Sequence, residues 1–188
     1  DFILISRMRE DQYPLLEDFI ASNPNYKISI NKKGNITKIY TPSKAKLSTI
    51  GKIGLITAGT SDIAIAEEIK MIAEAMHCEV YTAYDVGIAG FHRIFEPLKT
   101  MIDNEVDVIV VAAGMEGTLP GIVSALVDIP VIGVPTSNGY GYGGKGEGAL
   151  TTMLQSCAPG LTVVNIDNGV GAAASAILIA KRKHKEKN

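Results

Sequence analysis

The turn Gly59-Thr60-Ser61-Asp62 combines a glycine with three small polar side chains, a composition suited to binding phosphate. It follows the apolar run 53–57, which is typical of a buried strand, and it precedes 63–76, where apolar residues recur at helical spacing. Unpaired N–H groups at the start of such a helix lie at the positive end of its dipole and bind anions. We therefore expect Gly59, Thr60, Ser61 and Asp62 to hold a phosphate of a nucleotide or sugar-phosphate substrate.

Helix capping is the alternative explanation for this turn. Thr60, Ser61 or Asp62 could each cap the helix, but no Glu or Gln follows any of them by three residues, so we expect no capping box. The turn also lacks the glycine and lysine spacing of dinucleotide-binding and P-loop motifs, which argues against both classes.

The segment from Asp85 to Arg93 ends in a histidine–arginine pair. Arg93 can bind a phosphate through two parallel hydrogen bonds, and His92 can exchange protons near neutral pH. We expect Asp85 and Arg93 to take part in substrate binding and His92 in catalysis. A surface histidine without a function is the alternative.

Glu116 lies between Gly114 and Gly117, directly after the apolar stretch 106–113. A carboxylate between glycines has few structural reasons to be there, and partial burial would make it a usable general base. We expect Glu116 to be catalytic and Gly114 to contact the substrate. The alternative is a glutamate favoured by the dipole at a helix N-terminus, with Pro120 in the first turn.

The loop 136–148 has six glycines in the ten residues from 139 to 148, so its backbone can approach a ligand closely. Tyr140 and Tyr142 would let it act as a lid or an inter-subunit contact, and a disordered linker is the alternative. Ser137 and Tyr140 in this loop, and Asn168 in the loop 165–171, are further candidates for substrate binding.

Neither of the two cysteines has the spacing of a metal ligand. Cys78 stands beside the start of a predicted strand and is expected in the core. Cys157 lies near the end of a predicted helix, where a lone cysteine usually packs without reacting. Its position alone therefore leaves both an inert and a catalytic thiol open.

The segments between these residues alternate between two types of pattern. Strands are expected at 52–57, 79–84, 106–112, 130–134 and 161–166, and helices at 62–77, 90–104, 118–127, 147–157 and 170–183. Such alternation predicts a three-layer α/β fold of the flavodoxin-like class, with a five-stranded parallel sheet between helices. Every polar, glycine-rich loop follows the carboxyl end of a strand, so we expect the site at that edge.

Residues 1–48 do not follow this alternation. A short helix is expected after Pro14, and a β-hairpin from Tyr26 to Tyr40. We expect a small N-terminal α+β extension that packs on the main domain, 49–188, or on a neighbouring subunit, because it is too small to hold its own core. The sequence begins at Asp1 rather than Met, which is compatible with a truncated N-terminus.

The composition excludes several classes of function. A net charge of −2 argues against a nucleic-acid surface, and the basic segment Lys181–Lys185 is expected to be a solvated, fraying end. No apolar run reaches the roughly 18 residues that a membrane span needs. With no visible secretory signal and only two cysteines, we expect a cytoplasmic protein with reduced thiols.

Three motifs together resemble the aminoimidazole-ribonucleotide carboxylase/mutase (PurE-type) family of purine biosynthesis: Gly59-Thr60-Ser61-Asp62, Ala113-Gly114 followed by Leu119-Pro120-Gly121, and Val131-Ile132-Gly133-Val134-Pro135. The likeness covers roughly residues 51–183. The family has Ser-Ala-His-Arg after its second strand, where this chain has the longer 85–93. It also has a histidine before Leu-Pro-Gly, where Thr118 stands here with Glu116 close before it.

These departures, with the segments 135–141, 156–158 and 165–169, resemble the LarB branch. Its members are pyridinium-3,5-biscarboxylic acid mononucleotide synthases, which begin assembly of the nickel-pincer nucleotide cofactor. The resemblance implies carboxylation of nicotinic acid adenine dinucleotide at pyridinium C5 by CO2 and hydrolysis of its phosphoanhydride with release of AMP. It also implies a homo-octamer with sites between subunits. No tightly bound cofactor is expected, and assistance of the hydrolysis by Mg²⁺ is left open.

For that reaction the resemblance implies that Cys157 adds to the ring as a thiolate and that Glu116 removes the C5 proton. Ser61, Asp62 and Arg93 would hold phosphates, with His92 near the phosphoanhydride. A PurE-type mutase or carboxylase acting on aminoimidazole ribonucleotide is the first alternative. A non-catalytic nucleotide-binding module is the second.

Overall fold

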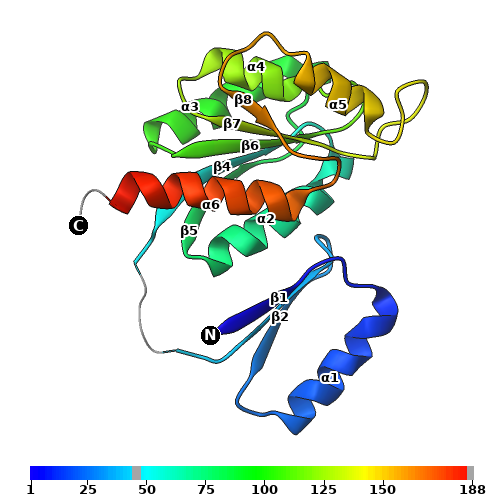
Figure 1. The fold of residues 1–188 in the computed structure, drawn as a ribbon, viewed down its shortest axis with the longest axis vertical. Coiled ribbons are helices and arrows are strands. Elements are labelled where there is room, and N and C mark those ends of the chain that lie inside the picture. Colours follow the sequence, from blue (N-terminus) through cyan, green and yellow to red (C-terminus); the bar gives the residue numbers. More distant parts are fainter. Residues whose placement is uncertain (44–47, 186–188) are drawn as a thin grey trace.

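The computed structural model describes residues 1–43 and 48–185, which form two β-sheets and the helices packed around them (Figure 1). The larger sheet consists of β4 (Gly51–Thr57), β5 (Cys78–Ala83), β6 (Val108–Ala113), β7 (Val131–Pro135) and β8 (Leu161–Val163). Its strands are all parallel, in the order β5-β4-β6-β7-β8. The predicted five-stranded parallel sheet is confirmed, although β8 ends at Val163 rather than at 166.

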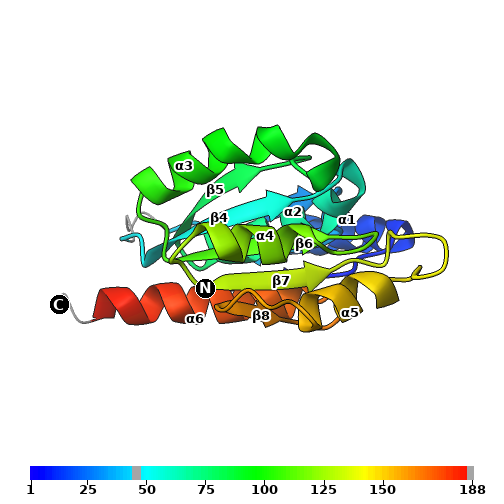
Figure 2. The same ribbon diagram turned by 90° about the horizontal axis from the view of Figure 1, so that it is seen from above.

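Helices cover both faces of this sheet. α2 (Ile63–Ala75) and α6 (Gly169–Lys185) pack on one face, and α3 (Phe95–Asp103), α4 (Leu119–Leu126) and α5 (Glu147–Leu154) pack on the other (Figures 1 and 2). Successive residues of β6 face opposite layers, so Val108 lies under α6 and Ile109 lies in the opposite cluster. Because both faces are covered, β6 is apolar at every position, as the sequence predicted.

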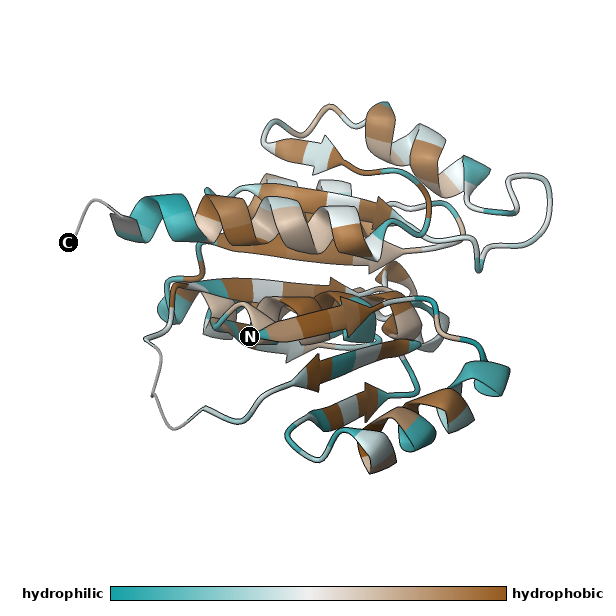
Figure 3. Ribbon diagram, turned by 60° about the horizontal axis from the view of Figure 1, so that its bottom comes forward, coloured by the Kyte–Doolittle hydropathy of each residue, from teal (hydrophilic) through white to brown (hydrophobic). Residues whose placement is uncertain are grey.

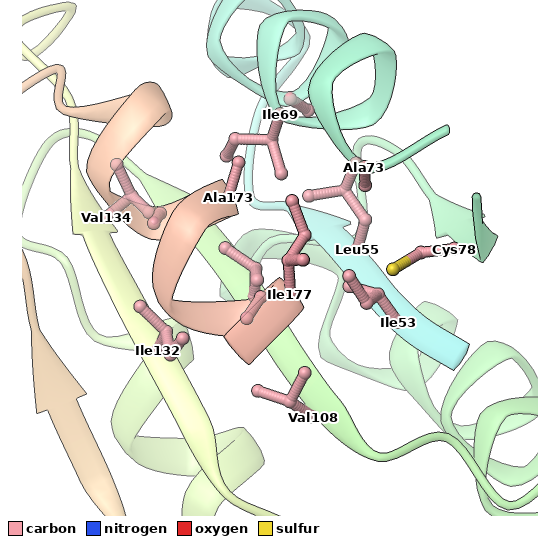
Figure 4. Packing of buried hydrophobic residues seen from close by; sticks show 14 of the residues in the cluster. Ile53, Leu55, Ile69, Ala73, Cys78, Val108, Ile132, Val134, Ala173 and Ile177 are labelled. Carbon is pink, nitrogen blue, oxygen red and sulfur yellow. The ribbon is translucent and has the colours of Figure 1, made fainter. Parts of the chain in front are cut away.

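Small side chains on α6 let this helix lie close to the sheet. Ala173, Ala176 and Ala180 are fully buried, and Ile177 packs beside them among the apolar side chains of β4, β6 and β7 (Figure 4). A Cβ added to Gly51 would meet the Cβ of Ala180 at 2.5 Å, so the first residue of β4 has no room for a side chain.

Three predicted helices differ at one end or both from the sequence expectation. η2 (Thr60–Asp62) and η3 (Ile88–Ile94) are 3₁₀ segments that precede α2 and α3, so His92 and Arg93 lie outside the α-helix. α5 ends at Leu154 rather than at 157. The Ser156 hydroxyl accepts a hydrogen bond from the Ala158 N–H at 3.3 Å, and Pro159 follows, which together favour an end to the helix. Cys157 is therefore a loop residue.

The N-terminal extension contains β1 (Phe2–Ile5), η1 (Glu10–Gln12), α1 (Tyr13–Ser22), β2 (Lys27–Asn31) and β3 (Ile36–Tyr40). The predicted helix and hairpin are confirmed, whereas β1 was not predicted because its four residues show no alternation of apolar and polar side chains. Its strands form an antiparallel sheet in the order β1-β3-β2, and a small cluster of Met8, Leu16 and Ile39 joins that sheet to α1.

The extension packs on α2 of the main domain, which is the first of the two expected partners. Asn31 Nδ2 donates a hydrogen bond to Glu67 Oε2 at 2.6 Å. Gly34 lies so close to α2 that an added Cβ would meet the Glu68 backbone nitrogen at 2.6 Å. The hairpin turn and α2 therefore fit together at backbone distance.

The basic end is exposed at Lys181, Arg182 and Lys183, as expected, but it is helical rather than frayed in the residues described. α6 runs to Lys185, and its hydrophilic last turns (Figure 3) reach the buried carboxylate of Asp107. Lys183 Nζ lies 3.0 Å from Asp107 Oδ1, and His184 Nε2 lies 3.1 Å from Oδ2, which also accepts the Lys52 N–H at 2.7 Å. None of the helices described is long and apolar enough to cross a membrane.

We expect Asp107→Asn to lower the free energy of unfolding by about 1–3 kcal/mol, because a buried charged acceptor loses its ionic partners on α6. Asp103→Asn, an exposed change on α3, is the matched control and should stay within about 0.5 kcal/mol of the wild type. Urea unfolding followed by circular dichroism measures both. Equal midpoints for the two variants would contradict the structural role of Asp107.

Candidate active site

A cavity of about 190 Å³ lies beyond the carboxyl ends of β4, β5 and β6. The chain leaves β4 for β5 on one side and returns to β6 on the other, so the ends of β4 and β6 flank a switch point of the sheet. Ligands of open parallel sheets bind in the crevice at such a point. We call this cavity the switch-point pocket. Predicted site residues that line it are Gly59, Ser61, Asp62, Gly114 and Glu116, and others are Ala58, Gly87, Ile88, Ala89, Ala113, Met115, Thr118, Leu119 and Asn138.

The Asp62 carboxylate holds two loops of the pocket together. Asp62 is 2% exposed, and its Oδ1 accepts a hydrogen bond from the Thr136 hydroxyl at 2.6 Å. Its Oδ2 accepts the Gly59 N–H at 2.9 Å, and the Asp62 N–H donates back to the Gly59 carbonyl at 3.2 Å. The N-cap is Gly59 rather than Thr60, Ser61 or Asp62, and glycine has no side chain to complete a capping box. The Asp62 carboxylate thus supplies only one of the two side-chain hydrogen bonds of that motif.

This geometry distinguishes the four residues of the turn. Asp62 fixes the turn but would repel a phosphate, so its part in binding is to position its neighbours. Ser61 is exposed at the pocket, and its carbonyl accepts the Asn138 side-chain amide at 2.8 Å. Thr60 is exposed to solvent and is not one of the residues that line the pocket. Gly59 and Ser61 are thus the members of the turn best placed to meet a ligand.

Close backbone contacts set the shape of the pocket. A Cβ on Gly87 would lie 2.5 Å from the Ala58 carbonyl oxygen, and one on Gly114 would lie 2.8 Å from Thr136 Oγ1. The loops that follow β4, β5, β6 and β7 therefore touch one another where these glycines stand.

Asp85 and Arg93 lie together beside the pocket, not in its lining. Arg93 Nη1 is 3.1 Å from Asp85 Oδ2, and both side chains are partly exposed. Asp85 has a φ of 58°, and its N–H donates to the buried Thr57 hydroxyl at 3.0 Å. His92, next to Arg93, is exposed. Arg93 would have to exchange this carboxylate for a phosphate in order to bind one.

Glu116 lies at the mouth of the pocket, on a tight turn. The Gly117 N–H donates to the Gly114 carbonyl at 2.9 Å, and Met115 and Gly117 have φ values of 48° and 68°. Glu116 is exposed, so the partial burial that we expected is not provided by the single chain.

Cys157 lies in a different hollow from Glu116. It is exposed and lines a groove of about 530 Å³ between α4 and α5, and Thr118 borders both this groove and the switch-point pocket. The structure therefore does not bring Cys157 and Glu116 into one pocket of a single chain. Cys78 is buried, as expected, and burial together with nearby Asp107 raises the pKa of its thiol to about 11.

The remaining predicted residues lie outside the pocket lining. The Ser137 N–H donates to Asp167 Oδ1 at 2.9 Å, in a neighbouring cleft. Tyr140 is 80% exposed on the loop that projects between β7 and α5 (Figure 1). Asn168 Oδ1 accepts the Gly171 N–H at 2.9 Å and so caps the start of α6. Sequence reasoning missed Thr136 and Asn138 as site residues, because their contacts to Asp62 and Ser61 join segments more than 70 positions apart.

Acidic side chains near the pocket do not form a cation cage. Among the described residues, no three His, Cys, Asp or Glu side chains gather in a metal-binding group. Asp62 and Asp85 are already engaged with protein partners, so a Mg²⁺ ion at this edge would need ligands from substrate phosphates besides the exposed Glu116.

Comparison with known proteins identifies relatives that cover most of this chain. The chain is 56% identical over 161 residues to an uncharacterised protein of Methanocaldococcus jannaschii, covering 86% of this chain and 61% of that relative. It is 34% identical to an N5-carboxyaminoimidazole ribonucleotide mutase of the same organism, over 70% of this chain and 80% of the relative. A mutase of the same name from Pyrococcus abyssi is 31% identical, over 72% of this chain and 76% of its own length.

A family model described as AIR carboxylase matches residues 52–188, from the first positions of β4 onward. The switch-point pocket, the glycine-rich loop and both cysteines all lie within that match. The chain therefore belongs to the AIR carboxylase family.

Proposed function

We propose that this chain carboxylates the pyridinium ring of nicotinic acid adenine dinucleotide at C5 with CO2 and hydrolyses its phosphoanhydride, releasing AMP, as the LarB branch does. One observation carries the proposal. Asp62 and Glu116 are the ionisable side chains among the residues described as lining the pocket, and Asp62 is held by hydrogen bonds. The free titratable group at the pocket is thus a glutamate, where the resemblance to PurE-type mutases implies a histidine.

A pyridinium ring is electron-poor and does not attack CO2 by itself. Addition of the Cys157 thiolate at C4 forms a C–S bond and makes C5 a nucleophilic, enamine-like carbon. C5 then forms a bond to CO2, and Glu116 removes the C5 proton. The electron pair of that C–H bond restores aromaticity as the thiolate leaves, so the cysteine is regenerated.

This chemistry requires Cys157 and Glu116 to meet, and we propose that they do so between copies of the chain. The pocket of about 190 Å³ is smaller than usual ligand sites, which supports a site completed by another subunit. Exposed apolar side chains near the pocket support an assembly as well, among them Phe91 and Phe95, whose rings pack edge to face. A homo-octamer in the cytoplasm remains the expected form.

The rival proposal is a mutase or carboxylase of aminoimidazole ribonucleotide. The relatives named as mutases, at 31–34% identity, favour it. The shared scaffold explains that likeness without fixing the reaction, because fold does not determine chemistry. A non-catalytic nucleotide-binding module is the weaker rival, since it gives no reason for Glu116 at the pocket.

The activity test incubates the assembled protein with the dinucleotide and bicarbonate-derived CO2. We expect AMP and a doubly carboxylated mononucleotide, detected by mass spectrometry, and a loss of about 10²–10⁴-fold in rate for Glu116→Gln. Cys157→Ser should abolish carboxylation, whereas the control Cys78→Ala should retain it. Parallel reactions with Mg²⁺ or EDTA decide whether the ion assists hydrolysis. Turnover of aminoimidazole ribonucleotide in place of the dinucleotide, unaffected by Cys157→Ser, would establish the mutase instead.

Thiol labelling provides an independent test of which cysteine is available. At pH 8 we expect iodoacetamide to modify Cys157 alone, because Cys157 is exposed while Cys78 is buried with a pKa of about 11. Peptide mass spectrometry identifies the labelled site, and labelling in urea should reach both. Equal labelling of the two cysteines in the folded protein would contradict the burial of Cys78.

A further inference from the structure

We propose that the cleft between the N-terminal extension and the edge of the parallel sheet binds the phosphorylated ribose of a nucleoside monophosphate. We call it the N-terminal cleft. It has a volume of about 550 Å³, within the usual range for small-molecule sites, and is lined among others by Arg7, Glu68, Ser137, Asn138, Ile166 and Asp167. The inference extends the proposed function, because the cleft would hold the adenylate half of the dinucleotide.

Glu68 is the residue that points to a ligand. It lies on α2, is only 4% exposed, and makes no hydrogen bond to any residue within 1–43 and 48–185. Gly169, the first residue of α6, lies so close that an added Cβ would overlap the carboxylate. A carboxylate that lines a cleft without a protein donor can accept hydrogen bonds from a ligand there. The two hydroxyls of a ribose are donors of the kind it would accept.

Burial and two neighbouring charges determine the pKa of the Glu68 carboxyl group. Burial raises the pKa of Glu68, the Arg7 charge lowers it, and the Asp167 charge raises it. A hydroxyl pair that donates to the carboxylate would replace the water lost on folding and favour its ionised form. A bound ribose would thus offset part of the desolvation of Glu68.

Arg7 supplies the positive charge for a phosphate. Its side chain is exposed, and Nη2 donates to the Asp167 main-chain oxygen at 3.4 Å, which holds the guanidinium beside the cleft. Arg9, also in the lining, is paired with Asp11 at 3.0 Å. Arg7 therefore has donors to spare for a phosphate, which guanidinium groups bind bidentately. A ligand with hydroxyls for Glu68 and an anion for Arg7 is a sugar phosphate.

The cleft adjoins the switch-point pocket. Asn138 lines both, and its side-chain amide donates to the Ser61 carbonyl on the phosphate-binding turn. A dinucleotide could thus place its pyridinium ring in the pocket, its phosphoanhydride over Ser61 and Asn138, and its second ribose phosphate in the cleft. A mononucleotide substrate would leave the cleft unused.

Calorimetric titration of the full chain with AMP tests the cleft without any turnover. We expect Arg7→Gln to weaken AMP binding at least about tenfold, and Lys33→Gln, an exposed change in the hairpin turn outside the cleft, to have no effect. Wild-type protein should bind AMP at least about tenfold more tightly than 2′,3′-dideoxy-AMP. Glu68→Gln should remove most of that preference.

Absence of AMP binding, or binding that Arg7→Gln and Glu68→Gln leave unchanged, would overturn the inference. The outcome is separable from that of the proposed function. AMP binding that depends on Arg7, in a protein that does not turn over the dinucleotide, supports the cleft and refutes the carboxylase. If the protein turns over the dinucleotide but its AMP binding is unchanged by Arg7→Gln and Glu68→Gln, the cleft proposal is refuted and the proposed function is not.

Stability against pH tests the burial of Glu68 separately. A carboxyl whose pKa is raised on folding stabilises the protein below its unfolded pKa, and this contribution is lost as pH rises through the folded value. The melting temperature of Glu68→Gln minus that of the wild type should therefore increase from pH 4 to pH 8. The exposed control Glu17→Gln should show no such trend. A difference independent of pH would mean that Glu68 is not held in a desolvated place.

Discussion

A parallel sheet buried on both faces leaves only the loops at its strand ends free to meet a ligand. Here α2 and α6 cover one face and α3, α4 and α5 cover the other, so the apolar strands carry no accessible chemistry. All strands run the same way, and the loops after β4, β5, β6 and β7 therefore collect at one edge. The pocket and the Asp62 hydrogen bonds follow from that constraint.

Much of this arrangement can be predicted from the sequence because it depends on local patterns. Apolar runs such as 106–113 and the spacing of Ile65 and Ile69 define the strands and helices, and glycine-rich segments mark the loops of the edge. Strand β1 was missed because its residues become a strand only through pairing with β3. The helical order of the basic end could not be predicted for a similar reason, since the Asp107 carboxylate that contacts His184 lies 77 positions away.

The site itself was only partly predictable. The sequence located Gly59, Ser61, Gly114 and Glu116 at one edge, and the structure places them around one pocket. The sequence could not show that the Asp62 carboxylate already accepts hydrogen bonds from Gly59 and Thr136. Nor could it show that Cys157 lines a separate groove. Arg7 and Glu68 carried no motif at all. Their relation arises only because the N-terminal sheet docks on α2.

Helix α6 links two distant parts of the molecule. It has 17 residues and therefore a length of about 25 Å. It runs over the face of the sheet from the carboxyl ends of the strands to their amino ends. Its first residue, Gly169, lies against Glu68 of the N-terminal cleft. Near its other end, Lys183 and His184 form ion pairs with Asp107, which directly precedes β6. The ion pairs at one end of this helix therefore help to hold in place the residue that packs against Glu68 at the other end.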